Sequence, residues 1–209
     1  MGYGTAELGL AAAELLIELY LLKFYNVVVG LPSYLTALAL SVAILWDAVS
    51  DPIMGELSDR THHRAGRRRP YFLPGALALA VSLVIVFNPP TSGSIAWKFS
   101  YLLCAYLLLT TSMTVLSVPH LALAGELSFD RNERTEIFGY RRLFTTVGLV
   151  FGTLLPTLTL QLSGLEEDGG LAKSRSLASF ALAVTILVTA WITLRSTRGL
   201  DLLELSLIH

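Results

Sequence analysis

Charged residues are scarce in this sequence, and cysteine occurs once. Charged residues make up 15% of the 209 residues, against about 25% in soluble domains, while hydrophobic residues make up 54%. This composition excludes an ordinary soluble domain. The single Cys104 excludes an intrachain disulfide and leaves the redox compartment open. The net charge of −1 gives no sign of nucleic-acid binding, because the arginines of one basic loop are balanced by acids elsewhere.

Motifs of the common enzyme classes are missing as well. The sequence has no HExxH, GxSxG, CxxC or glycine-rich phosphate motif, so we expect neither an enzyme nor a cofactor. His62 and His63 are neighbours in an arginine-rich loop, which disfavours a metal site there. The first apolar run carries Glu7, Glu14 and Glu18 and lacks a basic start and a small-residue cleavage site. We therefore expect a retained helix rather than a cleaved signal peptide.

Apolar residues come in long runs, which predicts an all-α integral membrane protein. Glycine, proline and polar breaks divide these runs into six helices, at residues 8–30, 34–58, 71–87, 96–125, 137–162 and 177–194. Residues 126–136 and 165–176 are expected to be polar surface loops. Pro119 is expected to bend the fourth helix. The bundle is expected to fill residues 1–199, with a short C-terminal tail at residues 200–209.

Basic residues gather on one side of these predicted spans. The loops after the second and fourth helices, together with the tail, hold eleven of the fifteen: Arg60, Arg64, Arg67, Arg68, Arg69, Arg131, Arg134, Arg141, Arg142, Arg195 and Arg198. The other side holds Lys23, Lys98, Lys173 and Arg175. By the positive-inside rule both termini are cytoplasmic. We expect the protein in a plasma membrane of the bacterial inner-membrane type.

Acidic residues lie inside two of the predicted spans. Asp47 and Asp51 are four residues apart, so they share one face of the second helix, and Glu7, Glu14 and Glu18 share one face of the first. Ionisable groups at membrane depth cost about 2.5 to 3.5 kcal/mol each, and they usually mark an ion or substrate path. We interpret Asp47 and Asp51 in this way. The alternative is a polar helix end that reaches the lipid headgroups.

Two separated motifs carry a family resemblance. Residues 46–55 read WDAVSDPIMG and are followed by GRRRP at 66–70, and residues 118–142 read VPHLALAGELSFDRNERTEIFGYRR. In this order they resemble the glycoside–pentoside–hexuronide:cation symporters, the melibiose permease branch of the major facilitator superfamily. The superfamily's gating motif between helices 2 and 3 is met by Gly55, Asp59, Arg60, Gly66, Arg67, Arg68 and Arg69. The resemblance covers the N-terminal six-helix half only and implies its three-plus-three inverted repeat.

The resemblance implies a secondary transporter in which a cation drives solute uptake. Asp47 and Asp51 are expected to bind that cation, with Glu14 or Glu18 as contributors. Carboxylate oxygens suit a hard ion such as Na⁺. Two close carboxylates also raise one another's proton affinity, so H⁺ is equally open as the coupling ion.

Four residues are candidates for substrate contact: Tyr20, His120, Tyr140 and Arg142. Arg142 matches the arginine that lines the family's cavity. Its neighbour Arg141 is interpreted as interfacial, since adjacent residues cannot both point inward. The alternatives are core packing for Tyr20 and a hydrogen bond to backbone for His120.

Three positions depart from the family's sugar-binding pattern. The aspartate of its first helix corresponds to Ala11, with Glu14 three residues further on the same face. The aspartate and tryptophan of its fourth helix correspond to Ser117 and Leu121. The resemblance therefore does not extend to melibiose-like galactoside recognition.

Three functions follow as alternatives. The chain is one half of a symporter for a sugar-like or other small solute, a carrier of lipids or lysolipids, or a truncated product or accessory membrane subunit without transport. Expected partners are membrane lipids, a small-molecule substrate, and either a second copy in a parallel homodimer or a separate C-terminal-half protein. The first, second, fourth and fifth helices are expected at that interface.

Overall fold

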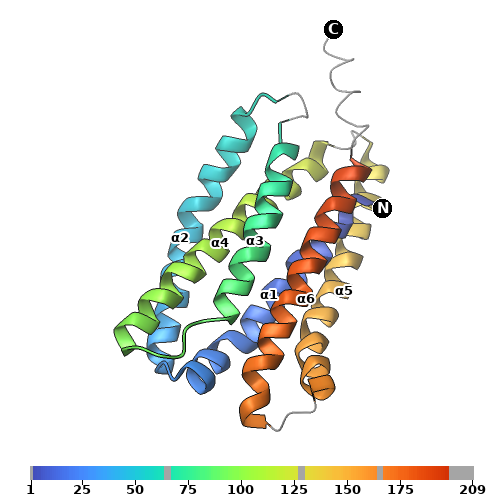
Figure 1. Cartoon of the computed structure of the whole chain (residues 1–209). Coiled ribbons are helices and arrows are strands. Elements are labelled where there is room, and N and C mark those ends of the chain that lie inside the picture. Colours follow the sequence, from blue (N-terminus) through green and yellow to red (C-terminus); the bar gives the residue numbers. More distant parts are fainter. Residues whose placement is uncertain (1, 64–66, 127–129, 164–166, 198–209) are drawn as a thin grey trace.

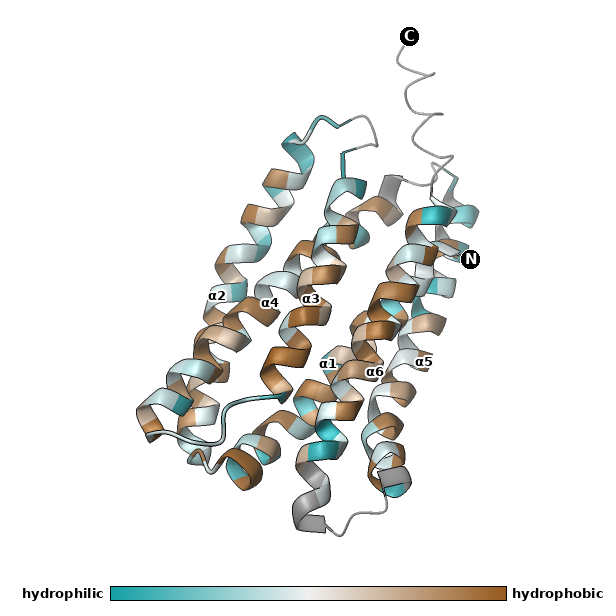
Figure 2. Ribbon diagram, viewed as in Figure 1, coloured by the Kyte–Doolittle hydropathy of each residue, from teal (hydrophilic) through white to brown (hydrophobic). Residues whose placement is uncertain are grey.

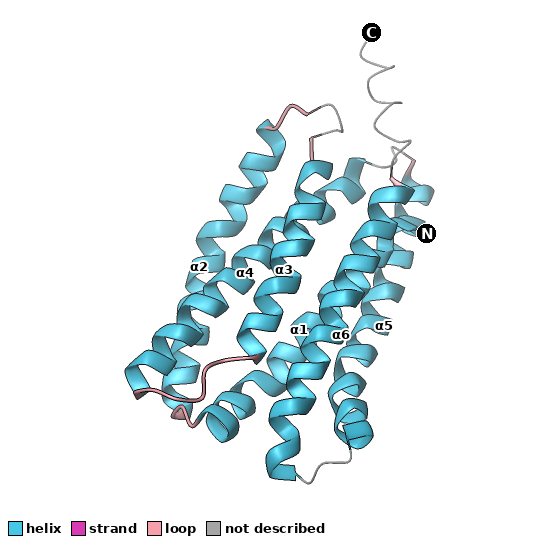
Figure 3. Ribbon diagram, in the orientation of Figure 1, coloured by secondary structure: helices cyan, strands magenta, loops and turns pink. Residues whose placement is uncertain are grey.

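The computed structural model describes residues 2–63, 67–126, 130–163 and 167–197, and this part of the chain contains helices and connecting loops but no strand (Figure 3). The six long helices are α1 (Thr5–Phe24), α2 (Ser33–Arg60), α3 (Phe72–Phe87), α4 (Ile95–Glu126), α5 (Arg131–Ser163) and α6 (Glu167–Ser196). Short 3-10 turns are η1 (Gly2–Gly4) and η3 (Arg69–Tyr71), and η2 (Tyr25–Val29) is a π-helical turn. The expected tail at residues 200–209 lies outside the described residues.

Five segments of the described part are long and apolar enough to cross a membrane: Ser33–Arg60, Arg69–Phe87, Ile95–Ala124, Thr135–Gln161 and Ala172–Ser196. Helix α1 is not among them, because Glu7, Glu14, Glu18 and Lys23 lie within its 20 residues. The all-α membrane architecture is therefore confirmed, and a sixth span at α1 stays a prediction.

The first expected helix runs on past α1 through a change of helix type. The π-helical turn η2 extends α1 to Val29, and Gly30 ends it in the left-handed conformation with φ 71°. The amide of Leu31 then donates a 2.9 Å hydrogen bond to the carbonyl of Tyr25. Because a side chain strains this backbone conformation, glycine is the natural residue at the turn.

The expected surface loop at residues 126–136 is wrong in its second part, because α5 begins at Arg131. Asp130 provides the physical reason. Its Oδ1 accepts hydrogen bonds from the amides of Asn132 at 2.6 Å and Glu133 at 3.2 Å, which is an N-cap. The acidic Glu133 also lies in the first turn, where the helix dipole favours negative charge.

The expected loop at residues 165–176 is wrong as well, because α6 begins at Glu167. Ser174 is fully buried, and its hydroxyl donates a 2.8 Å hydrogen bond to the carbonyl of Pro156 on α5. Polar residues in this stretch pack against a neighbouring helix, which low hydropathy alone does not reveal.

Two groups of three helices make up the bundle. Helix α4 packs on α2 and α3, α1 packs on α5 and α6, and α3 and α6 join the groups. Figure 1 shows the start of α1, the α2–α3 connection and the end of α6 at one end of the bundle, which we call the termini end; the opposite end is the far end. Figure 2 shows hydrophobic residues along the middle of the helices and hydrophilic residues gathered near their ends.

The contact between α1 and α5 depends on small residues. A Cβ atom at Gly148 would collide with the carbonyl oxygen of Leu8, and one at Gly152 would collide with that of Ala12. These glycines are four residues apart, a spacing that lets two helix backbones approach closely within a membrane. The close approach fixes the rotation of α1 and so decides which of its acids are buried.

Candidate functional site

Asp47 and Asp51 lie on α2 where this helix packs against α4. Asp51 Oδ1 accepts a 2.8 Å hydrogen bond from the hydroxyl of Thr114, and Trp46 Nε1 donates a 2.8 Å hydrogen bond to the hydroxyl of Thr111. Asp47 Oδ1 is shielded from solvent and has no hydrogen-bond partner among the described residues. A carboxylate pair with hydroxyl oxygens beside it offers the ligand chemistry that a hard cation requires.

Glu14 and Glu18 are exposed on α1. None of the four predicted cation-binding acids forms an ion pair with a described residue. However, nowhere in the described part do three His, Cys, Asp or Glu side chains converge on one point. The acids therefore form a pair on α1 and a pair on α2 rather than a closed site.

Two of the four substrate candidates are held by the bundle itself. The Tyr20 hydroxyl donates a 3.1 Å hydrogen bond to the carbonyl of Thr153 on α5, and the Arg175 guanidinium lies 4.0 Å above the Tyr20 ring centre. Tyr20 is thus held against α5 and α6, and its contact with a substrate stays a prediction. His120 is 0% exposed, so it too lies inside the helix bundle.

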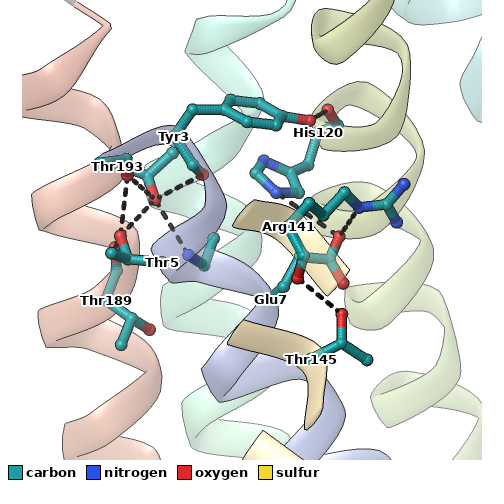
Figure 4. Close-up of polar contacts among 10 residues, drawn as sticks. Tyr3, Thr5, Glu7, His120, Arg141, Thr145, Thr189 and Thr193 are labelled. Carbon is teal, nitrogen blue, oxygen red and sulfur yellow. Dashed lines mark hydrogen bonds and ion pairs between the residues drawn. The ribbon is translucent and has the colours of Figure 1, made fainter. Parts of the chain in front are cut away.

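The surroundings of His120 form a cluster that joins η1, α1, α3, α4 and α5 at the termini end (Figure 4). Its ring stacks on Tyr3 with centroids 4.4 Å apart and meets the edge of Phe72 at 5.5 Å. Tyr3 donates its hydroxyl proton to the carbonyl of His120. His120 Nε2 lies 3.5 Å from Glu7 Oε1, and neither ring nitrogen has a hydrogen-bond partner within the described part.

Arg141 completes this cluster, which the sequence did not predict. Its Nε lies 2.6 Å from Glu7 Oε1, and its side chain is 24% exposed, whereas Arg142 is exposed on the surface. Arg141 thus turns into this six-helix bundle and Arg142 lies on its surface, and the expected substrate contact of Arg142 stays a prediction. No signal for this pair was available in the sequence, because only the structure shows that Glu7 is buried and so requires a counter-charge nearby. Tyr140 lies beside Arg141 and is partly exposed.

The arginine-rich motif connects three helices at the termini end. Arg68 Nη2 lies 2.8 Å from Asp59 Oδ1, which links the start of η3 to the end of α2. Arg69 Nη2 donates a 2.8 Å hydrogen bond to the carbonyl of Leu194 near the end of α6. Arg60 pairs instead with Glu56 on its own helix at 2.5 Å.

The other motif positions make weaker contributions in the described part. Gly55 lies in α2, where an added Cβ would contact a methyl group of Val118 on α4 at 4.0 Å. Arg67 is exposed, and Gly66 lies outside the described residues. The gating role of this motif stays a prediction.

Residues 2–201 match the family of MFS/sugar transport proteins. The chain belongs to this family. It is 33% identical to the inner membrane symporter YicJ of Escherichia coli (strain K12) over 197 residues. This aligned stretch covers 90% of this chain and 42% of YicJ. It is 32% identical over 171 residues to the putative glycoside/cation symporter YagG of the same organism, covering 81% of this chain and 37% of YagG.

A third relative is the sodium-dependent lysophosphatidylcholine symporter 1 of Xenopus tropicalis, 27% identical over 140 residues, or 66% of this chain and 26% of the relative. The chain therefore spans less than half the length of these relatives. The matches confirm the resemblance to the glycoside–pentoside–hexuronide:cation symporter branch, in its N-terminal half. The relatives are transporters, which also confirms the expectation that this family member is not an enzyme.

Proposed function

We propose that the chain is one six-helix half of a cation-coupled secondary transporter. The observation that carries the proposal is the set of four acids on α1 and α2, Glu14, Glu18, Asp47 and Asp51, without ion-pair partners in the described part of an apolar bundle. Asp47 and Asp51 bind the coupling ion, Na⁺ or H⁺, next to the hydroxyl of Thr114. Glu14 and Glu18 contribute from α1.

A second bundle completes this site. Acids that faced lipid would each carry the insertion cost of about 2.5 to 3.5 kcal/mol, whereas a second bundle would cover them and enclose a watery path. We propose a parallel homodimer or a complex with a separate C-terminal-half protein, with α1, α2, α4 and α5 at the interface. Arg142, exposed on α5, is the substrate candidate best placed to reach a solute there, with Tyr140 beside it.

Cross-linking tests this assembly. Two cysteine variants are made in a Cys104→Ser background. Ala48→Cys on α2 lies next to the acids, Thr146→Cys on α5 lies one turn from Arg142, and both positions are exposed. Either is expected to form a disulfide-linked dimer if a second copy covers this face. Cysteine at Leu77, exposed on α3, is the matched control and is expected to stay monomeric. A monomeric mass in mild detergent with no cross-link at any position would favour the truncated or accessory protein.

The packing pattern supports a three-plus-three repeat. If α1, α2 and α3 correspond to α4, α5 and α6, the α1–α5 contact corresponds to α4–α2, and the α1–α6 contact corresponds to α4–α3. Both members of each pair are major contacts in this bundle. We propose that the helices alternate in direction across the membrane, with the termini end cytoplasmic.

The orientation has its own test in intact cells. His62, next to the arginine motif, and Ser94, at the far end, are both exposed. In the Cys104→Ser background, the variant Ser94→Cys is expected to react with an impermeant thiol reagent. The variant His62→Cys is expected not to react with it. The reverse labelling pattern would show that the termini end faces outward.

Transport is tested in proteoliposomes that contain the full chain. Uptake of a labelled solute from a panel of sugars and lysolipids is expected to require an inward Na⁺ or H⁺ gradient. Asp51→Asn is expected to abolish that dependence, and Glu56→Gln, an acid on the same helix that is already paired with Arg60, is the matched control. Uptake that ignores both gradients, or that survives in Asp51→Asn, would contradict the proposed site.

One observation favours a lysolipid substrate as the second candidate. Leu121 is 49% exposed on α4, at the position where the family's sugar-binding pattern has a tryptophan, and Ser117 replaces the aspartate one turn earlier. An apolar surface here suits an acyl chain better than a sugar hydroxyl. The substrate panel separates the two, because competition by lysolipids and not by sugars identifies the amphiphile carrier.

A further inference from the structure

Arg175 lies on α6 near the far end of the bundle and is a buried cation without a counter-charge among the described residues. The residue is 7% exposed, its Nη1 is shielded from solvent, and this nitrogen has no hydrogen-bond partner in the described part of the chain. The guanidinium lies 4.0 Å above the ring centre of Tyr20 on α1. An aromatic face compensates only part of the cost of removing a guanidinium from water.

Arg195 on the same helix provides the comparison. It also lies 4.0 Å above an aromatic ring, that of Trp191, but both of these residues are exposed. Water therefore solvates Arg195, and the stacking needs no further partner. The same stack at Arg175 is closed to solvent and leaves a strong donor unused, which is rare for a buried polar group.

A small recess lies beside the stack. It is lined by Tyr20, Lys23, Phe24, Val28 and Arg175, and its volume of about 10 Å³ is enough for one water-sized group. Lys23 follows Tyr20 by three residues on α1 and so reaches the same side of the helix. Of the described residues that line this recess, two are cationic and none is acidic, so its chemistry selects an anion.

We propose that this recess binds one anionic oxygen of a phosphate group, held by Arg175 and Lys23 over the Tyr20 ring. Arginine donors match phosphate oxygens in geometry, and the ammonium of Lys23 adds a second charge. The bound oxygen would join α1 to α6 at the far end, where the next phosphate atoms extend outward. A phospholipid headgroup and free phosphate both present such an oxygen. The proposal does not depend on transport or on the acids of α2.

Thermal unfolding of the full chain in a maltoside detergent, which contains no phosphate, tests the proposal. The unfolding midpoint is measured against inorganic phosphate, against sodium chloride at equal ionic strength, and against a short-chain phospholipid below micelle-forming concentration. The midpoint is expected to rise with phosphate, with phospholipid, or with both, and the arm that responds identifies the source. An equal rise with chloride, or no rise in any arm, would overturn the proposal.

Variants assign the effect to the recess. Arg175→Gln is expected to weaken the apparent affinity by about 10- to 100-fold, the usual range for losing a hydrogen bond to a charged group. Without ligand this variant is expected to melt no lower than the wild type, because an uncompensated buried charge is gone. Arg195→Gln is the matched control and is expected to respond like the wild type. If Arg175→Gln responds like the wild type, or only melts lower by the same amount at every ligand concentration, the arginine is structural and the proposal fails.

Lys23→Gln keeps the test decisive if Arg175→Gln does not fold. Lys23 is exposed, so its replacement is expected to leave the fold intact and to lower the apparent affinity for the responding ligand by about 10-fold. Arg175→Lys keeps the charge and is expected to keep a weaker response. An unchanged affinity in Lys23→Gln would overturn the two-cation site.

Discussion

Two sets of acids in this bundle have opposite surroundings. Glu7 is buried at the termini end, 2.6 Å from Arg141 and 3.5 Å from His120. Asp47 and Asp51 lie along α2 with hydroxyl neighbours but no cationic partner among the described residues. Glu7 and Glu14 share a face of α1 by sequence spacing, yet only Glu7 is covered. The difference shows that charge alone does not identify an ion site, because a partner already neutralises Glu7.

We infer different roles for the two sets of acids from this comparison. The Glu7–Arg141 pair links α1 to α5, so we infer a structural role for it. The acids of α2 retain free carboxylate oxygens, so we infer that their partner is a mobile cation. If this is right, removing the first set costs stability and removing the second costs ion binding.

The largest expected effect is on the paired acid. Glu7→Gln leaves Arg141 without its counter-charge, and we expect a loss of about 3 kcal/mol in unfolding free energy, at the low end for a broken buried pair because Arg141 is 24% exposed. Unfolding in mixed detergent micelles with rising dodecyl sulfate measures it. A loss under about 0.5 kcal/mol, typical of a surface change, would remove the structural role of Glu7.

A double-mutant cycle on the same pair is expected to give a smaller number. Arg141→Gln combined with Glu7→Gln removes both charges, and we expect a coupling energy of about 1 to 2 kcal/mol between the two sites. The same unfolding assay on the two single variants and the double variant gives this value. Strictly additive losses would mean that the 2.6 Å contact contributes no net stability.

The unpaired acid is expected to show the opposite sign. Asp47 Oδ1 is shielded and accepts no hydrogen bond, so Asp47→Asn relieves a desolvated charge. In sodium-free detergent we expect a gain of up to about 1 kcal/mol in unfolding free energy. If Asp47→Asn lowered the unfolding free energy as much as Glu7→Gln does, the two sets of acids would not differ in role.

The smallest expected effect is at a surface pair. Glu56 lies 2.5 Å from Arg60 one turn along α2, and both side chains are largely exposed. Glu56→Gln is expected to cost about 0.3 to 0.5 kcal/mol, since water and salt screen such pairs. Its loss in unfolding free energy is also expected to shrink in high salt, whereas that of Glu7→Gln is expected to persist.

Hydropathy and breaker residues located the helices, because a membrane span requires a continuous apolar run. They failed at helix ends outside such runs. The start of α5 depends on the Asp130 cap, and the first turns of α6 include Ser174, which donates a hydrogen bond to the Pro156 carbonyl on α5. The two motifs carried the family resemblance, which the comparisons confirm and which composition alone does not reveal.

The site was predicted less completely, because rotation about each helix axis is set by packing. The near-contact of Gly148 and Gly152 with α1 turns Glu7 inward, and no spacing rule distinguishes Glu7 from Glu14. The same applies to Arg141 and Arg142, of which only Arg141 turns into this bundle. For the buried Arg175, the sequence predicted only the side of the membrane. Its contact with Tyr20 joins helices far apart in the chain, so the sequence could not predict that contact.

Direct measurement of ion binding tests the central claim, that the unpaired acids of α2 form the cation site. Calorimetric titration of the purified full chain with sodium chloride, at several pH values to detect displaced protons, compares the wild type with Asp51→Asn and with Glu56→Gln. We predict that the wild type and Glu56→Gln bind Na⁺ saturably, or bind it in competition with H⁺. We predict that Asp51→Asn loses this binding. Binding in Asp51→Asn equal to that of the wild type would contradict the claim.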